Sequence, residues 1–330
     1  MRNLFFCLFV CFGAFIGVLP CSAATLSESE KIQETTKAAF RGGDFAKIEG
    51  LLKQYRESRS RTSSGLWHLR AAYGGAFIAM TTDTKTEAQW EDLESKINKS
   101  IVSAPHSASG PIFLATAYYW HGFQHRGLGF ADTVTPEGWK QFARYMGLAR
   151  QTLEVNKATS SVDPTWYETM LKVAQGQSWS QEDVNSLLEE ALRKEPLHYG
   201  TYFAAVDLLL PMWGGSLEKI EAFADNAVAR TNQSEGSGMY ARIFWYVEQR
   251  IGSTLFKRKS VWPKMKAGFE DLIKKYPDSW NKNAYAKYAC QAGDYAVTAR
   301  FMPEIGNAPI LDAWNSQLYF ESCKYYSLKK

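Results

Sequence analysis

The sequence predicts an all-α protein, and three observations support this fold class. Apolar residues recur every three to four positions in several segments, which places them on one face of a helix. Capping residues, and a proline at a first helical turn, mark where such segments begin. No segment alternates apolar and polar residues between Asn-Gly turns, as the strands of a hairpin would. We expect roughly fourteen to sixteen helices.

The first helices begin at clear cap signals. Ser27 and Glu30 have the spacing of a capping box, in which each side chain binds the backbone N–H of the other residue. In the turn 41–45, glycine can end one helix in the left-handed conformation and Asp44 can cap the next. That next helix has an apolar stripe made of Phe45, Ile48, Leu51, Leu52 and Tyr55.

Later helices carry the same signals. Thr135 precedes Pro136, and proline is favoured at the first position of a helix. The turn 292–294 repeats the glycine-aspartate pattern of the first turn. Two further apolar stripes are Val184, Leu187, Leu188, Ala191 and Leu192, and Met265, Phe269, Leu272, Ile273 and Tyr276.

Internal similarity indicates a degenerate array of helical pairs. A proline followed closely by an aromatic residue opens helices at Pro164, Pro196 and Pro277. The spacing of the first two prolines is close to the roughly 34-residue period of tetratricopeptide (TPR) arrays. Pro277 does not keep that period, so the array contains insertions.

The loop 210–216, with the sequence Leu-Pro-Met-Trp-Gly-Gly-Ser, separates two apolar helices. Pro211 stops the preceding helix, two glycines allow a tight reversal under a packed Trp213 indole, and Ser216 caps the next helix. Backbone amides at that helix start could hold an anion, but a simple turn between helices is the interpretation that we favour.

This loop and several other stretches resemble a bacterial TPR-like domain of unknown function found in exported and envelope proteins. The stretches are 41–45, 211–216, 239–245, 262–265, 280–285 and 289–294. The resemblance covers roughly residues 27 to 305 and implies a TPR-like superhelix of antiparallel helical hairpins with irregular repeats. Many members have arginine where this chain has Met212, so a charged role is not transferred to that loop. The family has no established activity. The resemblance therefore implies only the fold and that the protein is bacterial and exported.

The first 23 residues have the pattern of a secretory signal peptide. Arg2 supplies a positive start, residues 4–19 are almost purely apolar, and residues 20–24 are mostly small. We expect cleavage after Ala23 or Ala24, which leaves 24–330 as one TPR-like helical domain in the periplasm or outside the cell. Two alternatives stay open. The leader could remain as a membrane anchor, although its apolar run is shorter than the roughly 20 residues that span a bilayer. Cys21 could instead be lipidated, although Pro20 fits a lipobox poorly.

Two of the five cysteines remain in the mature chain, because Cys7, Cys11 and Cys21 belong to the leader. In an oxidising compartment Cys290 and Cys323 can form one disulfide. The alternative is two buried thiols on separate helices, since cysteine packs as a small hydrophobic residue.

A metal site, a cofactor and a catalytic residue are not predicted. His121 and His125 share one face of a helix, a spacing that could supply two zinc ligands. However, Gly122 stands where a zincin has glutamate, and the nearby sequence offers no third ligand. We therefore interpret the pair as a polar helix edge beside Arg126. There is no Gly-x-Ser-x-Gly nucleophile elbow and no Gly-x-x-x-x-Gly-Lys-Ser/Thr phosphate-binding loop. The net charge of +4 is too small to indicate a nucleic-acid partner.

The aromatic residues indicate a binding groove. The 11 Trp and 17 Tyr residues include consecutive runs that cannot all face one core stripe. Trp and Tyr commonly anchor protein interfaces. We expect a concave groove that includes some of Trp120, Arg126, Trp213, Tyr240 and Trp245.

Our first functional hypothesis is an exported, non-enzymatic binding or scaffold protein, whose partner is another envelope protein or a peptide. The second is an envelope enzyme that acts on cell-wall glycan through a carboxylate in an aromatic cleft. A structural or lipid-associated envelope component is the third.

Overall fold

The computed structural model describes residues 27–329 of the chain. The predicted signal peptide and the lipidation alternative at Cys21 lie outside the described residues. Within the described part there are seventeen α-helices and no strand, and a single isolated antiparallel bridge joins Arg61 and Trp67. The prediction of an all-α fold is therefore confirmed. Among residues 27–329, none of the helices combines the length and the apolar sequence that a membrane span requires.

The α-helices are α1 (Glu28–Arg41), α2 (Phe45–Ser58), α3 (His68–Asp83), α4 (Glu87–Ser103), α5 (Ser109–Arg126), α6 (Pro136–Val155), α7 (Lys157–Ser160), α8 (Thr165–Gly176), α9 (Gln181–Lys194), α10 (Tyr199–Leu209), α11 (Leu217–Glu235), α12 (Gly238–Ile251), α13 (Val261–Lys275), α14 (Ser279–Gln291), α15 (Tyr295–Ile305), α16 (Leu311–Trp314) and α17 (Gln317–Leu328). Three 3₁₀ helices are η1 (Ala131–Thr133), η2 (Pro211–Trp213) and η3 (Gly252–Lys257).

The helices begin and end where the local chemistry predicts. Ser27 and Glu30 form the capping box of α1, and the Ser27 N–H donates to Glu30 Oε2 at 2.7 Å. Gly43 (φ 69°) and Gly293 (φ 77°) adopt the left-handed conformation, and the aspartate after each of them caps the following helix. The same glycine-aspartate turn thus joins α1 to α2 and α14 to α15.

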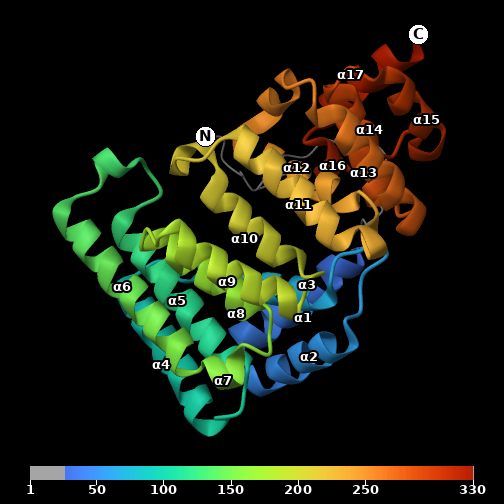
Figure 1. Ribbon diagram of the computed structural model, residues 1–330. Helices are drawn as coiled ribbons and strands as arrows, with labels where there is room; N and C mark the ends of the chain where they lie inside the picture. Colours follow the sequence, from blue (N-terminus) through green and yellow to red (C-terminus); the bar gives the residue numbers. More distant parts are fainter. Residues whose placement is uncertain (1–26, 330) are drawn as a thin grey trace, which may run out of the picture.

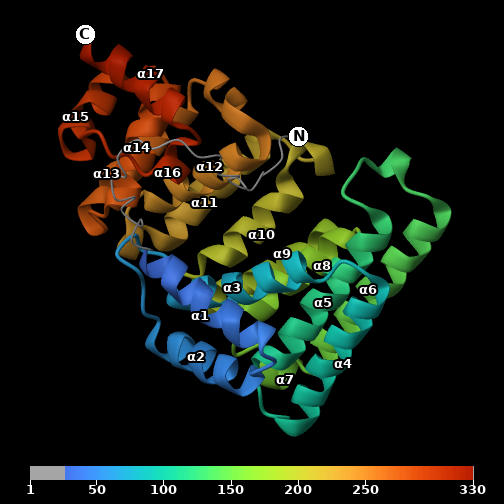
Figure 2. The same cartoon turned by 180° about the vertical axis from the view of Figure 1, so that it is seen from behind.

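The helices pack mainly as neighbours along the chain, in a series of helical hairpins. Close pairs include α5 with α6, α11 with α12, α12 with α13 and α14 with α15, while α1 packs on α3. Helices α4–α6 lie at one end of the molecule and α13–α17 at the other, with α8–α10 between them (Figures 1 and 2). The buried apolar residues form one continuous cluster from Ala39 to Cys323, so the core runs along the whole array.

The loop between α10 and α11 makes the tight turn that its glycines predict, but its tryptophan is not packed. Gly214 has φ 80°, and a Cβ atom at Gly215 would lie only 1.9 Å from the Leu209 carbonyl oxygen. The Trp213 side chain is 45% exposed. The expectation of a packed indole is therefore wrong, since Trp213 neither belongs to the buried core nor packs against it.

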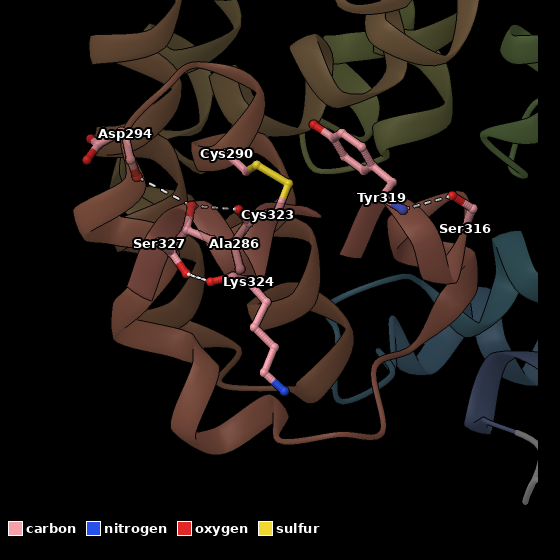
Figure 3. Close-up of a disulfide and its surroundings, with 9 residues drawn as sticks. Ala286, Cys290, Asp294, Ser316, Tyr319, Cys323, Lys324 and Ser327 are labelled. Atoms are coloured by element: carbon pink, nitrogen blue, oxygen red, sulfur yellow. Dashed lines mark hydrogen bonds between the residues drawn. A yellow bond between two sulfur atoms is a disulfide. The ribbon is translucent and has the colours of Figure 1, made fainter. Parts of the chain in front are cut away.

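A disulfide bond joins Cys290 on α14 to Cys323 on α17 (Figure 3). The two Cα atoms are 5.8 Å apart, and Cys323 is buried. Ser316 caps α17 by accepting a hydrogen bond from the Tyr319 N–H, and this sets the start of the helix that carries Cys323. The last helix of the chain is thereby fixed covalently to the array.

Candidate functional site

A hollow of about 630 Å³ lies between the two halves of the described chain. Its walls come from the first turns of α1, the loop 62–66, α3, α10, α12 and the start of α14. Three arginines line it, namely Arg70 from α3 and both Arg242 and Arg250 from α12. We call this hollow the Arg242 cleft. It exists only because segments distant in sequence meet there.

The loop between α2 and α3 links the N-terminal helices to the C-terminal ones through hydrogen bonds. Figures 1 and 2 both show this blue loop lying beside the C-terminal helices. The Ser64 carbonyl accepts hydrogen bonds from Arg242 Nη2 at 3.0 Å and from Asn281 Nδ2 at 3.1 Å. Ser63 Oγ donates to Asp278 Oδ2 at 2.7 Å. Gly65 has φ 86°, and a Cβ atom there would lie 2.5 Å from Arg242 Nη2, so this close approach requires glycine.

Half-buried aromatic side chains form much of the cleft surface. The rings of Phe203 on α10 and Tyr246 on α12 stack with their centroids 4.7 Å apart. The Arg70 guanidinium lies 5.4 Å from the Phe203 centroid, within cation–π distance. Trp245 and Trp280 add two indoles to the lining. The lining also includes four acidic residues, Glu28, Glu30, Asp278 and Asp312. The cleft thus offers flat apolar faces beside charges of both signs.

The three arginines differ in how their charge is balanced. Arg70 pairs with Glu168 at 2.9 Å, and Arg250 pairs with Asp207 at 3.3 Å. Among residues 27–329, no carboxylate lies within ion-pair distance of Arg242, and its buried Nε has no hydrogen-bond partner.

Arg242 therefore lacks a direct ion pair, although its guanidinium lies over the Tyr199 and Tyr276 rings. Burial alone would raise the pKa of the Glu235 carboxylate, but a hydrogen bond from Lys275 and the charge of Arg242 help to keep that pKa below its usual range. An anionic group of a ligand could supply the missing ion pair.

The charge of Arg70 is already used within the fold. Burial alone would raise the pKa of Glu168, but the positive charges of Lys172 and Arg70 hold that pKa well below its usual range. The Glu168 carboxylate accepts hydrogen bonds from both cations at 2.9 Å. Arg70 therefore shapes the wall of the cleft, and Arg242 remains the cation available to a ligand.

The structure separates the five residues predicted for a groove. Trp245 lines the Arg242 cleft. Tyr240 is only 1% exposed and stacks on Phe244 with centroids 4.7 Å apart, so it belongs to the core and its assignment to a groove is wrong. Trp213 is exposed on η2 and is not part of the cleft lining.

Trp120 and Arg126 lie near the end of α5 and do not line the cleft either. Trp120 packs on Tyr119 and Phe123 of the same helix. The Arg126 guanidinium lies 4.9 Å from the centroid of Trp139 and donates to the Gly127 carbonyl at 3.1 Å. Trp120 and Arg126 thus pack on aromatic side chains of α5 and α6 and not in the cleft.

Sequence reasoning missed Arg242, Arg70 and Trp280 as residues of a common site. Arg242 and Trp245 are three positions apart on α12, a spacing that places both on one helix face. That spacing was a usable signal for Arg242. No local signal links Arg70 or Trp280 to α12, because their proximity depends on how the two halves close.

The pair His121 and His125 does share one face of α5, with ring centroids 5.3 Å apart. The interpretation as a polar helix edge is wrong for His121, whose side chain is fully buried. A third potential ligand is also present, because the carboxylate of Glu87 on α4 lies beside both rings. Sequence inspection missed it because it lies well upstream of the pair.

No family model, no curated protein and no solved structure matches this chain.

Proposed function

We propose that this chain is an exported, non-enzymatic binding or scaffold protein that holds a segment of an envelope protein or peptide in the Arg242 cleft. The leader-like residues 1–23 support export to the bacterial periplasm or beyond. The disulfide between Cys290 and Cys323 also supports an oxidising compartment. We attribute the series of helical hairpins to a TPR-like array, an architecture whose curved faces bind extended partners.

The observation that carries the proposal is the state of Arg242. Its guanidinium faces a hollow of about 630 Å³ without a carboxylate partner among the described residues, beside Trp245. A partner with an acidic side chain or a terminal carboxylate would supply that missing anion. A neighbouring aromatic or aliphatic side chain of the partner would pack on Trp245 or Trp280.

The glycan-enzyme alternative has weaker support. A glycosidase needs a carboxylic acid of raised pKa that reaches the substrate. Burial raises the pKa of Asp163, but that side chain is fully buried against Arg56 and Tyr73 and does not line the cleft. We therefore favour binding over catalysis.

The test is in-cell crosslinking and affinity capture of the tagged protein from its native envelope, read by mass spectrometry. We expect one stoichiometric partner, whose capture falls at least about tenfold in Arg242→Gln and Trp245→Ala because each removes a central contact. Trp213→Ala is the matched control, since that indole is exposed outside the cleft. Circular dichroism of each variant verifies folding.

Two outcomes would overturn the proposal. One is equal capture by the wild type and both folded cleft variants. The other is retention of the protein on cell-wall glycan with no protein partner, which would favour the enzyme or a glycan-binding role.

A further inference from the structure

Three side chains from two packed helices converge at a second site, and none of them lines the Arg242 cleft. Glu87 is the first residue of α4, and His121 and His125 lie one turn apart near the end of α5. One potential ligand atom from each residue lies within 4.8 Å of the other two. We call these residues the Glu87 cluster.

The contacts within the cluster have the spacing of metal ligands. Glu87 Oε2 lies 3.0 Å from His121 Nε2 and 3.2 Å from His125 Nε2. Ligands held about 2.0–2.1 Å from zinc at tetrahedral angles are about 3.3 Å apart. Two of the three donor separations are therefore close to the value that a tetrahedral ion requires, and the third lies within 4.8 Å.

The two imidazole Nε2 atoms contact the Glu87 carboxylate at ion-pair distance. Both Nε2 atoms are buried and lack a hydrogen-bond partner, since their contacts with Glu87 do not have hydrogen-bond geometry. His121 is fully buried, so water does not compensate its nitrogen. A metal ion at the common point would satisfy both lone pairs.

A second carboxylate sets the tautomer of His121. Its Nδ1–H donates to Glu94 Oε1 at 2.6 Å, because an ionised carboxylate can only accept. The Nε2 atom of the neutral ring therefore carries the lone pair, and it faces Glu87. A carboxylate behind a histidine ligand is the usual arrangement at protein zinc sites.

The surrounding rings hold the ligands in place. Trp90 stacks on His121, and Tyr145 lies 4.0 Å from the His121 centroid and donates to Glu87 Oε1 at 3.2 Å. Gly122 makes this approach of α6 possible, because a Cβ atom there would lie 3.1 Å from Tyr145 Cβ and 3.0 Å from Met146 Cε. The glycine that separates this sequence from a zincin motif is thus part of the packing around the cluster.

We propose that Glu87, His121 and His125 bind a divalent transition-metal ion, with zinc as the preferred metal and solvent as the fourth ligand. Two imidazoles and one carboxylate form a donor set that suits zinc. The carboxylates of Glu87 and Glu94 supply two negative charges, which a divalent cation balances. Glu87 is 47% exposed, so the ion can enter from solvent and keep a water ligand.

The experiment uses the full chain, purified without a histidine tag and treated with a chelator. Zinc is added in a calorimeter, and cobalt is added separately so that its visible absorption reports the coordination. We expect one zinc ion per chain and the absorption bands of tetrahedral cobalt. Zinc should also raise the Tm, because it binds the folded state.

Three variants separate a metal site from a structural cluster. His125→Ala and Glu87→Gln remove partly exposed ligands, and we expect each to weaken zinc binding at least about 100-fold. Glu94→Gln removes the partner of His121 and should weaken binding about 10–100-fold. His106→Ala is the matched control, because His106 is exposed and outside the cluster. It should bind zinc as the wild type does.

The proposal is overturned if the chelated wild type takes up no stoichiometric zinc at micromolar concentration. It is also overturned if folded His125→Ala binds zinc as tightly as His106→Ala. Binding of zinc without tetrahedral cobalt bands would exclude this donor set.

Discussion

Arg242 Nη2 donates a hydrogen bond to the backbone carbonyl of Ser64, which lies 178 positions earlier in the chain. This contact couples the wall of the Arg242 cleft to the loop that closes the two halves. A change in the loop therefore alters both stability and the shape of the cleft, and this coupling leads to the first prediction.

Gly65→Ala should destabilise the protein more than an ordinary glycine substitution does. Its positive φ of 86° costs an alanine about 1–2 kcal/mol. The added Cβ also lies within 2.8 Å of the Tyr276 ring, which adds about 1–3 kcal/mol of steric cost. Urea denaturation of the variant and the wild type measures the loss.

Gly214→Ala is the matched control for that experiment. Gly214 has φ 80°, but a Cβ atom there meets nothing within 4 Å. It should incur only the backbone cost. Equal losses in the two variants would show that the approach of the loop to Arg242 and Tyr276 is not tight.

The second prediction concerns the disulfide between Cys290 and Cys323. The bridge spans a sequence separation of 33, and closing a loop of that size lowers the entropy of the unfolded chain enough to stabilise the fold by about 3–4 kcal/mol. A reductant should lower the urea midpoint of the wild type. A double alanine variant should start near that lower midpoint and be insensitive to reductant. A wild type with the same midpoint in both conditions would contradict the prediction.

The third prediction is a loss of stability as the pH falls, caused by His198. This side chain is 1% exposed, and burial lowers its pKa to about 4. Its unfolded pKa is about 6.5, so the unfolded state binds more protons between these two values and stability decreases with decreasing pH. From pH 7 to pH 5 this histidine should remove about 2 kcal/mol of the free energy of unfolding.

His198→Gln should remove that part of the pH dependence, although it lowers stability at pH 7 by disturbing a packed site. His106→Gln, at an exposed position, should keep the slope of the wild type. Urea midpoints measured from pH 4.5 to 7.5 test this. If His198→Gln retains the full slope, another group causes the acid sensitivity.

The fourth prediction concerns a buried ion pair in the N-terminal half. Asp163 is fully buried, pairs with Arg56 at 2.9 Å and accepts a hydrogen bond from the Tyr73 hydroxyl at 3.1 Å. Asp163→Asn should cost about 3 kcal/mol, because it removes the closer of the two carboxylates that balance a largely buried guanidinium and leaves only Glu49 at 3.7 Å. The exposed pair of Arg150 and Glu154 gives the control, since Glu154→Gln should cost less than about 1 kcal/mol. Similar costs for the two variants would contradict the argument.

Local signals predicted local structure well. The capping box at Ser27 and the turns at Gly43 and Gly293 form as expected, because each depends on residues within a few positions of one another. The apolar stripe Val184, Leu187, Leu188, Ala191 and Leu192 is buried for the same reason.

Long-range placement could not be predicted from these signals. Tyr240 and Trp213 are both aromatic residues in motif-like stretches, yet one is buried and the other is exposed. That difference depends on which helices pack on each residue. Glu87 was missed beside His121 because the packing of α4 on α5 brings them together, and no short motif records that packing.

The hydrogen bonds of Ser63 and Ser64 span 215 and 217 positions, to Asp278 and Asn281. In a simple stack of repeats, each repeat contacts only its nearest neighbours. These hydrogen bonds instead join residues far apart in the sequence, and such contacts raise the contact order. During synthesis the N-terminal helices emerge first, and their closing partners arrive only with α14. The cleft therefore cannot be completed until more than four fifths of the chain is available, and a truncated product would lack it altogether.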